Sequence, residues 1–269
     1  MPFRTFEVSD PRFTHDGLRW VTVRSDSLRG RGDVTLYVHP GAEAAGARDV
    51  PVVILLHGVY GSHWAWALKG GAHRTTARMI DAGELSPVVL AMPGDGLRGD
   101  GSGYVRQVGF DFEHWIVHEV PEVAREAVSG VSKESPLLLA GLSMGGFGAL
   151  RLGAKYPERF RALSGHSSAT LAEQFRAFAS NGIEEWSSAP EDRSVIAAME
   201  RSRGRLPPIR FDCGTEDPLL EGNRVLHREL EAAGIPHLYE EFPGGHTWDY
   251  WETHLVDTLR FFAERLKSP

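Results

Sequence analysis

The sequence predicts an α/β fold with a mostly parallel central sheet flanked by helices on both faces. Short apolar runs that end in Gly, Ser or Asp recur along the chain, which is typical of strands buried on both faces of a sheet. Stretches with helical spacing of apolar residues separate these runs, and such alternation favours a parallel sheet. With 269 residues, 42% of them hydrophobic, the chain is expected to form one domain over residues 1–269.

The elements are expected in a definite order along the chain. Alternating polar and apolar residues in LRWVTVRS and DVTLYVHP indicate two half-buried strands that pair as an antiparallel edge. Buried strands follow in PVVILLHG, SPVVLAMPG, SPLLLAGLS, FRALSGHSS and PPIRFDCGTED. Helices are expected over roughly 75–82, 113–128, 144–156 and 219–233. A last helix runs to the C-terminus, where Leu255, Leu259, Phe262 and Leu266 share one face.

One segment, from about 167 to 205, has no clear strand. Within it, AEQFRAFASNG and SVIAAMERS are expected to form short helices. Ligands of parallel α/β sheets bind at the carboxyl ends of the strands, so this segment could form a small cap over a site there.

The charge and composition exclude several classes of partner. A net charge of −7 argues against general affinity for nucleic acid or for anionic membranes. No apolar run reaches membrane-spanning length, and the start MPFRTFEVSDPRF lacks the features of a signal peptide. Cys213 is the single cysteine, which excludes an internal disulfide and fits a reducing compartment. We therefore expect a cytoplasmic protein that binds neither nucleic acid nor membrane; the sequence indicates no oligomeric state.

The segment Gly141-Leu142-Ser143-Met144-Gly145 carries the clearest chemical signal. This G-x-S-x-G pattern stands between the apolar strand LLLA and the helical stretch GFGALRLGAKY. A nucleophilic serine on such a sharp turn needs tiny residues two positions before and after it, because larger ones would collide. A chain with 30 glycines can contain the bare pattern by chance, but chance does not place it between a strand and a helix. Ser143 is therefore the expected nucleophile.

A serine hydroxyl needs an imidazole to accept its proton, and His246 is the expected base. It lies in FPGGHTWDYW, after the strand-like HLYEEF and before the last helix, where paired glycines allow a tight loop. The alternative is a surface histidine in a turn. The remaining histidines fit less well, because they fall within predicted helices or strands or precede the nucleophile.

The orienting acid is expected between serine and histidine in the chain, at the end of a strand. Asp217 follows the strand PIRFDCG by a short turn, whereas Asp212 lies inside that strand. Glu216 is the nearest rival. Asp217 could also cap the helix that follows, and both roles are compatible.

Two backbone N–H groups are expected to stabilise the negative oxygen of the reaction intermediate. One belongs to Met144, directly after the nucleophile. The other is expected in LLHGVYGSHW, where Gly58 gives access to the backbone and Val59 carries the N–H. His57 is interpreted as a support of this loop and not as a catalytic group.

Side chains near these segments are candidates for binding the substrate. Trp64 and Trp248 lie close in sequence to the oxyanion loop and to His246, and His166 follows the strand end ALSG. Tryptophan is more often simply part of a core. The Gly-rich GDGLRGDGSGY lacks the G-K-S/T of a phosphate loop and is interpreted as a wall of the site.

No metal site is expected. His114 and His118 share a helix face near Glu119 and Glu122, but spacing anchors no third ligand, so a solvated helix face is favoured.

Four segments, LLHGVYGSHWAW, GLSMGGFGALRLGAKYPERF, DCGTEDPLLEGNRVLHREL and PGGHTWDYW, resemble the esterase D family of α/β hydrolases over most of the chain. The resemblance implies the α/β-hydrolase fold, with Ser143, Asp217 and His246 as triad and Val59 and Met144 as oxyanion donors. The tributyrin-esterase branch is the most similar. This chain has H-G-x-x-G at the position where S-formylglutathione hydrolases have a segment similar to S-G-L-T-C.

The expected function is a serine carboxylic ester hydrolase that acts through an acyl-enzyme on a small or medium acyl ester, without a cofactor. Two other enzyme activities, acyl transfer and thioester hydrolysis, use the same triad. A catalytically silent binding protein on the same fold is the alternative from another class.

Overall fold

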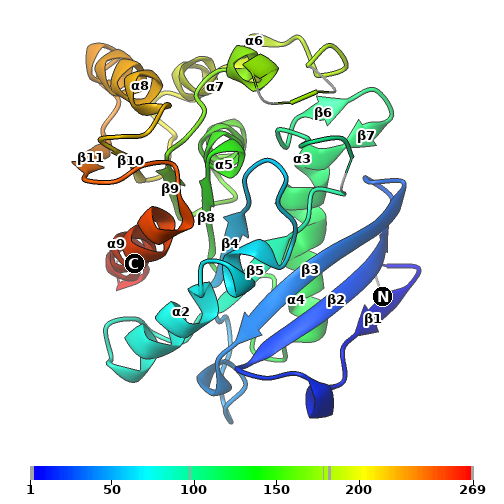
Figure 1. The fold of residues 1–269 in the computed structure, drawn as a ribbon. Helices are drawn as coiled ribbons and strands as arrows, with labels where there is room; N and C mark the ends of the chain where they lie inside the picture. The colour runs from blue at the N-terminus through cyan, green and yellow to red at the C-terminus, as the bar shows by residue number, and fades with distance from the viewer. Residues whose placement is uncertain (1–2, 97, 178, 181–182, 268–269) are drawn as a thin grey trace.

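A single large sheet organises the computed structural model, which describes residues 3–96, 98–177, 179–180 and 183–267. Among these residues, nine strands pair in the order β1-β2-β3-β5-β4-β8-β9-β10-β11 (Figure 1). Two short strands, β6 (Arg106–Gln107) and β7 (Phe110–Asp111), form a separate hairpin. The strands of the large sheet are β1 (Phe6–Val8), β2 (Leu18–Ser25), β3 (Gly30–Val38), β4 (Val52–Leu56), β5 (Val89–Pro93), β8 (Leu137–Leu142), β9 (Ala162–His166), β10 (Ile209–Gly214) and β11 (Leu238–Phe242).

The sheet is mostly parallel, as predicted. The strands β5, β4, β8, β9, β10 and β11 run parallel to one another. The predicted antiparallel edge is present in β2 and β3, which β1 extends on one side and β5 joins on the other. Because parallel strands end at the same edge, the segments that follow β4, β8, β10 and β11 meet there.

Helices cover both faces of this sheet (Figure 1). Side chains of α4, α5, α7 and α8 share one buried cluster, and those of α1, α2 and α9 share the other. The helices are α1 (Ala65–Leu68), α2 (Ala72–Asp81), α3 (Phe112–His114), α4 (Val120–Ala127), α5 (Met144–Lys155), α6 (Pro190–Arg193), α7 (Val195–Arg201), α8 (Leu220–Ala232) and α9 (Trp248–Lys267).

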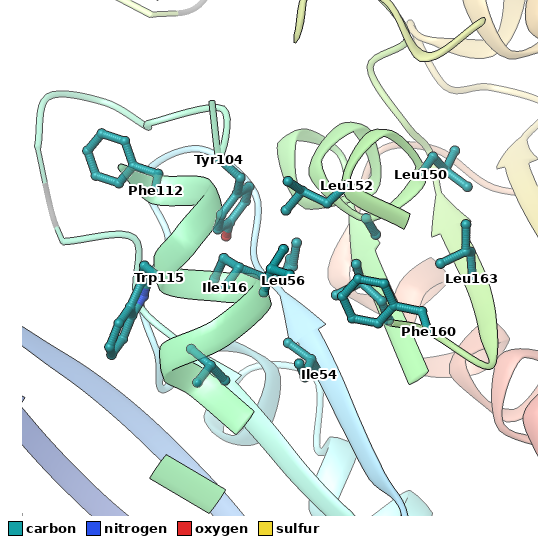
Figure 2. Close-up of a cluster of buried hydrophobic side chains, with 14 of the residues drawn as sticks. Ile54, Leu56, Tyr104, Phe112, Trp115, Ile116, Leu150, Leu152, Phe160 and Leu163 are labelled. Carbon is teal, nitrogen blue, oxygen red and sulfur yellow. The ribbon is translucent and has the colours of Figure 1, made fainter. Parts of the chain in front are cut away.

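The central strand β4 supplies side chains to both clusters in alternation. Ile54 and Leu56 belong to the cluster beneath α4 and α5, while Val53 and Leu55 belong to the cluster beneath α2 and α9. Figure 2 shows Ile54 and Leu56 on the side of Ile116. A period of two on a strand with both faces covered explains why VVILL is a continuous apolar run.

The helix predicted over 113–128 is present as a continuous helical run, 112–127, but its hydrogen-bond pattern changes along the run. A π-helical turn, Trp115–Glu119, separates α3 from α4. Pro121 lacks the N–H that would reach the carbonyl of Val117, and that carbonyl accepts a hydrogen bond from Arg159 at 3.1 Å instead. Proline inside the helical pattern therefore explains the π-helical turn.

The segment from 167 to 205 contains a 3-10 turn at Ala172–Ala177 and the helices α6 and α7. Both expected short helical stretches are thus present, and α6 is an addition to them. The described parts of this segment include a β-bridge between Leu171 and Ser194. The helix α7 packs on α5, which leads away from the nucleophile.

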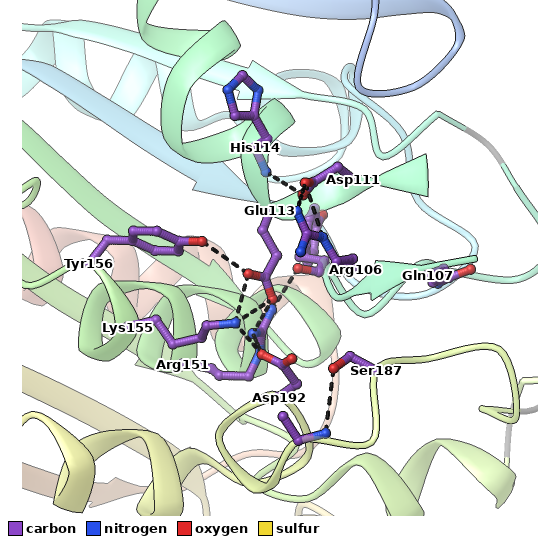
Figure 3. A network of polar contacts seen from close by, with 12 residues as sticks. Arg106, Gln107, Asp111, Glu113, His114, Arg151, Lys155, Tyr156, Ser187 and Asp192 are labelled. Carbon is purple, nitrogen blue, oxygen red and sulfur yellow. Dashed lines mark hydrogen bonds and ion pairs between the residues drawn. The ribbon is translucent and has the colours of Figure 1, made fainter. Parts of the chain in front are cut away.

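Buried charges anchor α5 to its neighbours (Figure 3). Arg151 is fully buried and donates to Glu113 of α3 at 2.6 Å and to Asp192 of α6 at 3.2 Å. Lys155 also contacts both carboxylates. Burial alone would raise the pKa of Glu113, but the charges of Arg151 and Lys155 lower it to about 2.

No helix in the described residues is long and apolar enough to cross a lipid bilayer.

Candidate functional site

Ser143 lies on the turn between β8 and α5 in a strained backbone conformation. Its φ is 55° and its ψ is −116°, a region that residues with a side chain rarely occupy. The flanking glycines make this turn sterically feasible: a Cβ on Gly141 would overlap the carbonyl of Gly145, and a Cβ on Gly145 would overlap the carbonyl of Leu56. The spacing of G-x-S-x-G therefore has the steric cause that the sequence suggested.

Ser143, His246 and Asp217 form a continuous chain of contacts. The Nε2 atom of His246 lies 3.0 Å from Ser143 Oγ, and its Nδ1 lies 2.8 Å from Asp217 Oδ2. The second oxygen of Asp217 accepts the N–H of Leu219 at 2.8 Å. The carboxylate is thus held in one orientation while it faces the imidazole. The helix-capping role considered for Asp217 is not observed, because the N-cap of α8 is Leu219, and Asp217 instead bonds within the turn that precedes the helix.

The rival carboxylates lie elsewhere. Glu216 is exposed, and its backbone N–H donates to the carbonyl of Gly244 at 2.9 Å. Asp212 is buried inside β10 and contacts His166 and Arg210. Of the three candidates, Asp217 is the one whose carboxylate meets His246.

Backbone contacts join the two loops that carry Asp217 and His246. Besides the Glu216–Gly244 bond, the N–H of Thr215 donates to the carbonyl of Phe242 at 2.8 Å. The ring of Trp251 meets the imidazole of His246 edge-on, with centroids 4.9 Å apart. The imidazole is thereby held between a carboxylate and an aromatic ring.

The expected oxyanion donors lie on the two segments that meet at Ser143. A Cβ on Gly58 would stand 2.9 Å from Leu142 Cδ1 and 3.3 Å from Ser143 Cβ, so the turn with Val59 packs directly against the nucleophile. In the described part of the chain, the N–H groups of Val59 and Met144 have no hydrogen-bond acceptor. Two unpaired donors beside a serine hydroxyl can stabilise a negative oxygen formed there.

His57 is buried beneath this turn, and its ring nitrogens contact groups other than Ser143. Its Nδ1 lies 2.7 Å from the carbonyl of Gly58, and its Nε2 lies 3.8 Å from Asp95 Oδ1. This position agrees with its interpretation as a support of the loop.

A cavity of about 290 Å³ opens at Ser143 and His246. Trp64 and Trp248, two of the side chains proposed to bind substrate, line it, together with Tyr60, Lys69 and Trp251. None of the described residues of the 167–205 segment lines this cavity.

The placement expected for His166 is wrong. Its side chain is fully buried behind the cavity, with Nδ1 2.8 Å from Asp212 Oδ2 and Nε2 2.9 Å from Thr258 Oγ1 of α9. As the last residue of β9, it points to the α9 face of the sheet. Its backbone still reaches the site, because its carbonyl accepts the N–H of Ser143 at 2.9 Å.

A buried charge network surrounds His166. Arg210 Nη1 lies 2.5 Å from Asp212 Oδ2, and the hydroxyl of Tyr250 donates to Asp212 Oδ1 at 2.8 Å. Burial alone would raise the pKa of Asp212, but His166, with help from Arg210, lowers it to about 2. Asp212 therefore remains ionised in the interior of the protein.

Lys69 and Tyr104 were not singled out from the sequence. Lys69 follows the four-residue helix α1 and lines the cavity. Tyr104 lies buried in the Gly-rich loop and donates to the carbonyl of His57. Neither belongs to a spaced motif. To predict Lys69 at the cavity, one would need to know that the backbone at Gly70 packs against the ring of Trp248.

The histidine pair on α3 and the following turn does not assemble a ligand cluster. His114 Nδ1 lies 2.9 Å from Ser27 Oγ, which itself contacts Glu119. Across the described residues, no group of three or more His, Cys, Asp and Glu side chains is arranged to hold a metal ion.

Comparison with known proteins relates this chain to one family and to several named proteins. The model of the family described as "Putative esterase" matches residues 26–262. An acetyl esterase of Caldicellulosiruptor saccharolyticus is 27% identical over 81% of this chain and 85% of its own. An S-formylglutathione hydrolase of Paracoccus denitrificans is 25% identical over 86% of this chain and 87% of its own. The solved structure of a ferulic acid esterase, 22% identical, superposes with a TM-score of 0.79 over 97% of this chain and all of its own, so the two share their fold.

Proposed function

The chain belongs to the esterase family and is a serine ester hydrolase of the α/β-hydrolase fold, and we propose that Ser143, His246 and Asp217 carry its reaction through an acyl-enzyme. The observation that carries this proposal is the unbroken chain of contacts from Ser143 Oγ through His246 to Asp217. A nucleophile, a base and an orienting acid in this order constitute the arrangement that acyl transfer to serine requires.

In the first half-reaction, Ser143 Oγ attacks the ester carbonyl while His246 Nε2 takes its proton. Asp217 orients the imidazole through Nδ1 and stabilises the imidazolium that forms. The N–H groups of Val59 and Met144 donate to the oxygen that becomes negative. His246 then returns the proton to the leaving alcohol as the tetrahedral intermediate collapses to the acyl-enzyme.

In the second half-reaction, water attacks the acyl carbon and gives a proton to the same imidazole. Collapse of this second intermediate releases the acid and restores the hydroxyl of Ser143. All steps use groups of this chain, the ester and water.

The substrate proposed is a small ester. A cavity of about 290 Å³ is at the lower end of the sizes of ligand pockets. The relative that is named an acetyl esterase supports a short acyl group for this chain as well. Short-chain 4-nitrophenyl esters are therefore the substrates of choice for a first assay.

Replacement of Ser143 by Ala tests the proposal. We expect the variant to keep the fold, seen as an unchanged far-UV circular dichroism spectrum, and to lose nearly all turnover of 4-nitrophenyl acetate. In addition, a fluorophosphonate probe should label the wild type and not the variant, since the label attaches to an activated serine. Turnover that survives in Ser143→Ala would contradict the proposed nucleophile.

We also propose a cytoplasmic location. Its support is that the sequence has one cysteine, Cys213, whose thiol is buried.

A further inference from the structure

Lys69 is the cationic side chain at the cavity that the proposed mechanism does not use. Apart from His246, every other residue that lines the cavity is uncharged, and none is acidic. In the described residues Lys69 makes no ion pair. Glu252 of α9 comes near Gly71, but it does not pair with Lys69. The ammonium group is thus available at the cavity to a negative charge from outside the protein.

The position of this ammonium group is restricted by its aromatic neighbour. Lys69 Nζ lies 5.5 Å from the ring centroid of Trp248, a distance at which a cation is attracted to the ring face. The ring itself is fixed, because it meets Trp66 and Trp251 edge-on at 5.7 and 5.3 Å. A Cβ on Gly70 would stand 2.8 Å from this ring, which shows how closely the backbone packs there.

The net charge of the protein has the opposite sign to the charge of Lys69. A net charge of −7 generally repels anions from the protein. Among the described residues that line the cavity, Lys69 stands beside Trp248 and Trp251 and provides the local attraction that an anionic substrate would need.

We propose that the physiological substrate is a small ester that carries a negatively charged group, and that Lys69 binds this group against Trp248. This inference rests on the proposed function, since it assigns a substrate class to the same site. The charge can stand on either side of the ester bond, and each side has its own arm in the experiment.

The experiment compares matched ester pairs that differ in one negative charge. In the first pair, 4-acetoxybenzoate and its neutral methyl ester, the charge is on the leaving group. In the second, mono-4-nitrophenyl succinate and methyl 4-nitrophenyl succinate, it is on the acyl group. For each pair, the ratio of kcat/KM for the anionic ester to kcat/KM for the neutral ester is measured in the wild type, Lys69→Met and Lys69→Arg.

We expect the wild-type ratio to exceed that of Lys69→Met by roughly three- to fivefold in at least one pair, the effect of a partly exposed charge contact. Lys69→Arg should retain most of the ratio because it keeps the charge. The difference should shrink in high salt, which screens it. Because the same two esters are used with each enzyme, comparing the ratio between wild type and variant cancels the intrinsic reactivity of the esters.

Lys133→Met is the matched control. Lys133 is exposed and lies before β8, at the opposite end of that strand from Ser143, and this variant changes the net charge by the same amount. Its ratios should equal those of the wild type. Equal ratios in wild type and Lys69→Met for both pairs would overturn the inference while leaving the esterase assignment intact. Absence of wild-type turnover on all four esters would instead count against the proposed function as well.

Discussion

The phenolic hydroxyl of Tyr104 donates a hydrogen bond to the main-chain carbonyl of His57 at 3.0 Å. This contact ties the Gly-rich loop to the turn that presents Val59. Burial raises the pKa of Tyr104, so the phenol remains a protonated donor. From the other side of the loop, the N–H of Gly103 contacts Met144 Sδ at 3.4 Å. The Gly-rich loop thus touches both segments that carry the proposed oxyanion donors.

We therefore expect Tyr104→Phe to lower activity by displacing the oxyanion turn, the turn at Gly58 and Val59 that carries one of the proposed oxyanion donors. The variant keeps the ring, which packs on Gly148, and loses the hydrogen bond. A displacement of the donor by a fraction of an ångström should lower kcat for 4-nitrophenyl acetate about ten- to hundredfold while KM changes little. Steady-state kinetics separate the two constants.

Tyr239→Phe is the control for loss of a tyrosine hydroxyl. Tyr239 donates to Glu241 at 2.9 Å, on β11 and away from the nucleophile. We expect its kcat to match the wild type. A Tyr104→Phe variant with wild-type kcat would show that the hydroxyl does not position the oxyanion turn.

Asp217→Asn tests the choice between two neighbouring carboxylates. The amide can still accept from Leu219 but can no longer hold the required tautomer of His246 or stabilise its charged form. We expect kcat to fall by roughly 10³- to 10⁴-fold, with little loss of stability. Glu216→Gln, one residue away and exposed, should leave kcat within a factor of about two. The reverse pattern would reassign the acid to Glu216.

The sequence was sufficient to predict the fold, and it singled out three side chains, Ser143, His246 and Asp217, that the structure brings into contact, because both depend on local patterns. Continuous apolar runs require strands covered on both faces, and a serine between two glycines requires a tight turn. His166 shows where this reasoning stops. Its position after a strand predicted a loop facing the cleft, but the pleat directs its side chain to Asp212 and Thr258 instead.

Residues that act through distant contacts could not be predicted in this way. Tyr104 meets His57 across 47 positions, and Arg151 meets Glu113 across 38. No sequence spacing signals such pairs, because the packing of separate elements creates them. Likewise, Lys69 belongs to the cavity because Gly70 allows the chain to pass beneath the ring of Trp248.

Glu113 makes the stability of the protein dependent on pH in the acid range. Its folded pKa, about 2, lies below the ordinary value of 4.5. Its stabilising effect is therefore fully present above about pH 4.5 and is lost as the pH falls towards 2. A shift of this size corresponds to about 3 kcal/mol of unfolding free energy at neutral pH.

Urea unfolding of wild type and Glu113→Gln at a series of pH values measures this effect. We expect the variant to be less stable at pH 7 and the difference between the two proteins to shrink steadily below pH 4.5. The control is Glu158→Gln, because Glu158 is exposed near the end of α5. Its difference from the wild type should stay within about 0.5 kcal/mol at every pH. A Glu113→Gln difference that does not change with pH would contradict the ionised network.

Gly141→Ala tests the steric basis of the nucleophile turn. The new Cβ would overlap backbone atoms of Gly145, which cannot move without displacing the start of α5. We expect a loss of several kcal/mol in unfolding free energy or an inactive folded protein, since overpacking against backbone has no rotamer that relieves it. Gly30→Ala is the matched control, because the nearest atom to its Cβ, the carbonyl oxygen of Leu28, is 3.5 Å away. Thermal unfolding and 4-nitrophenyl acetate turnover measure both variants, and a stable, fully active Gly141→Ala would refute the close approach at this turn.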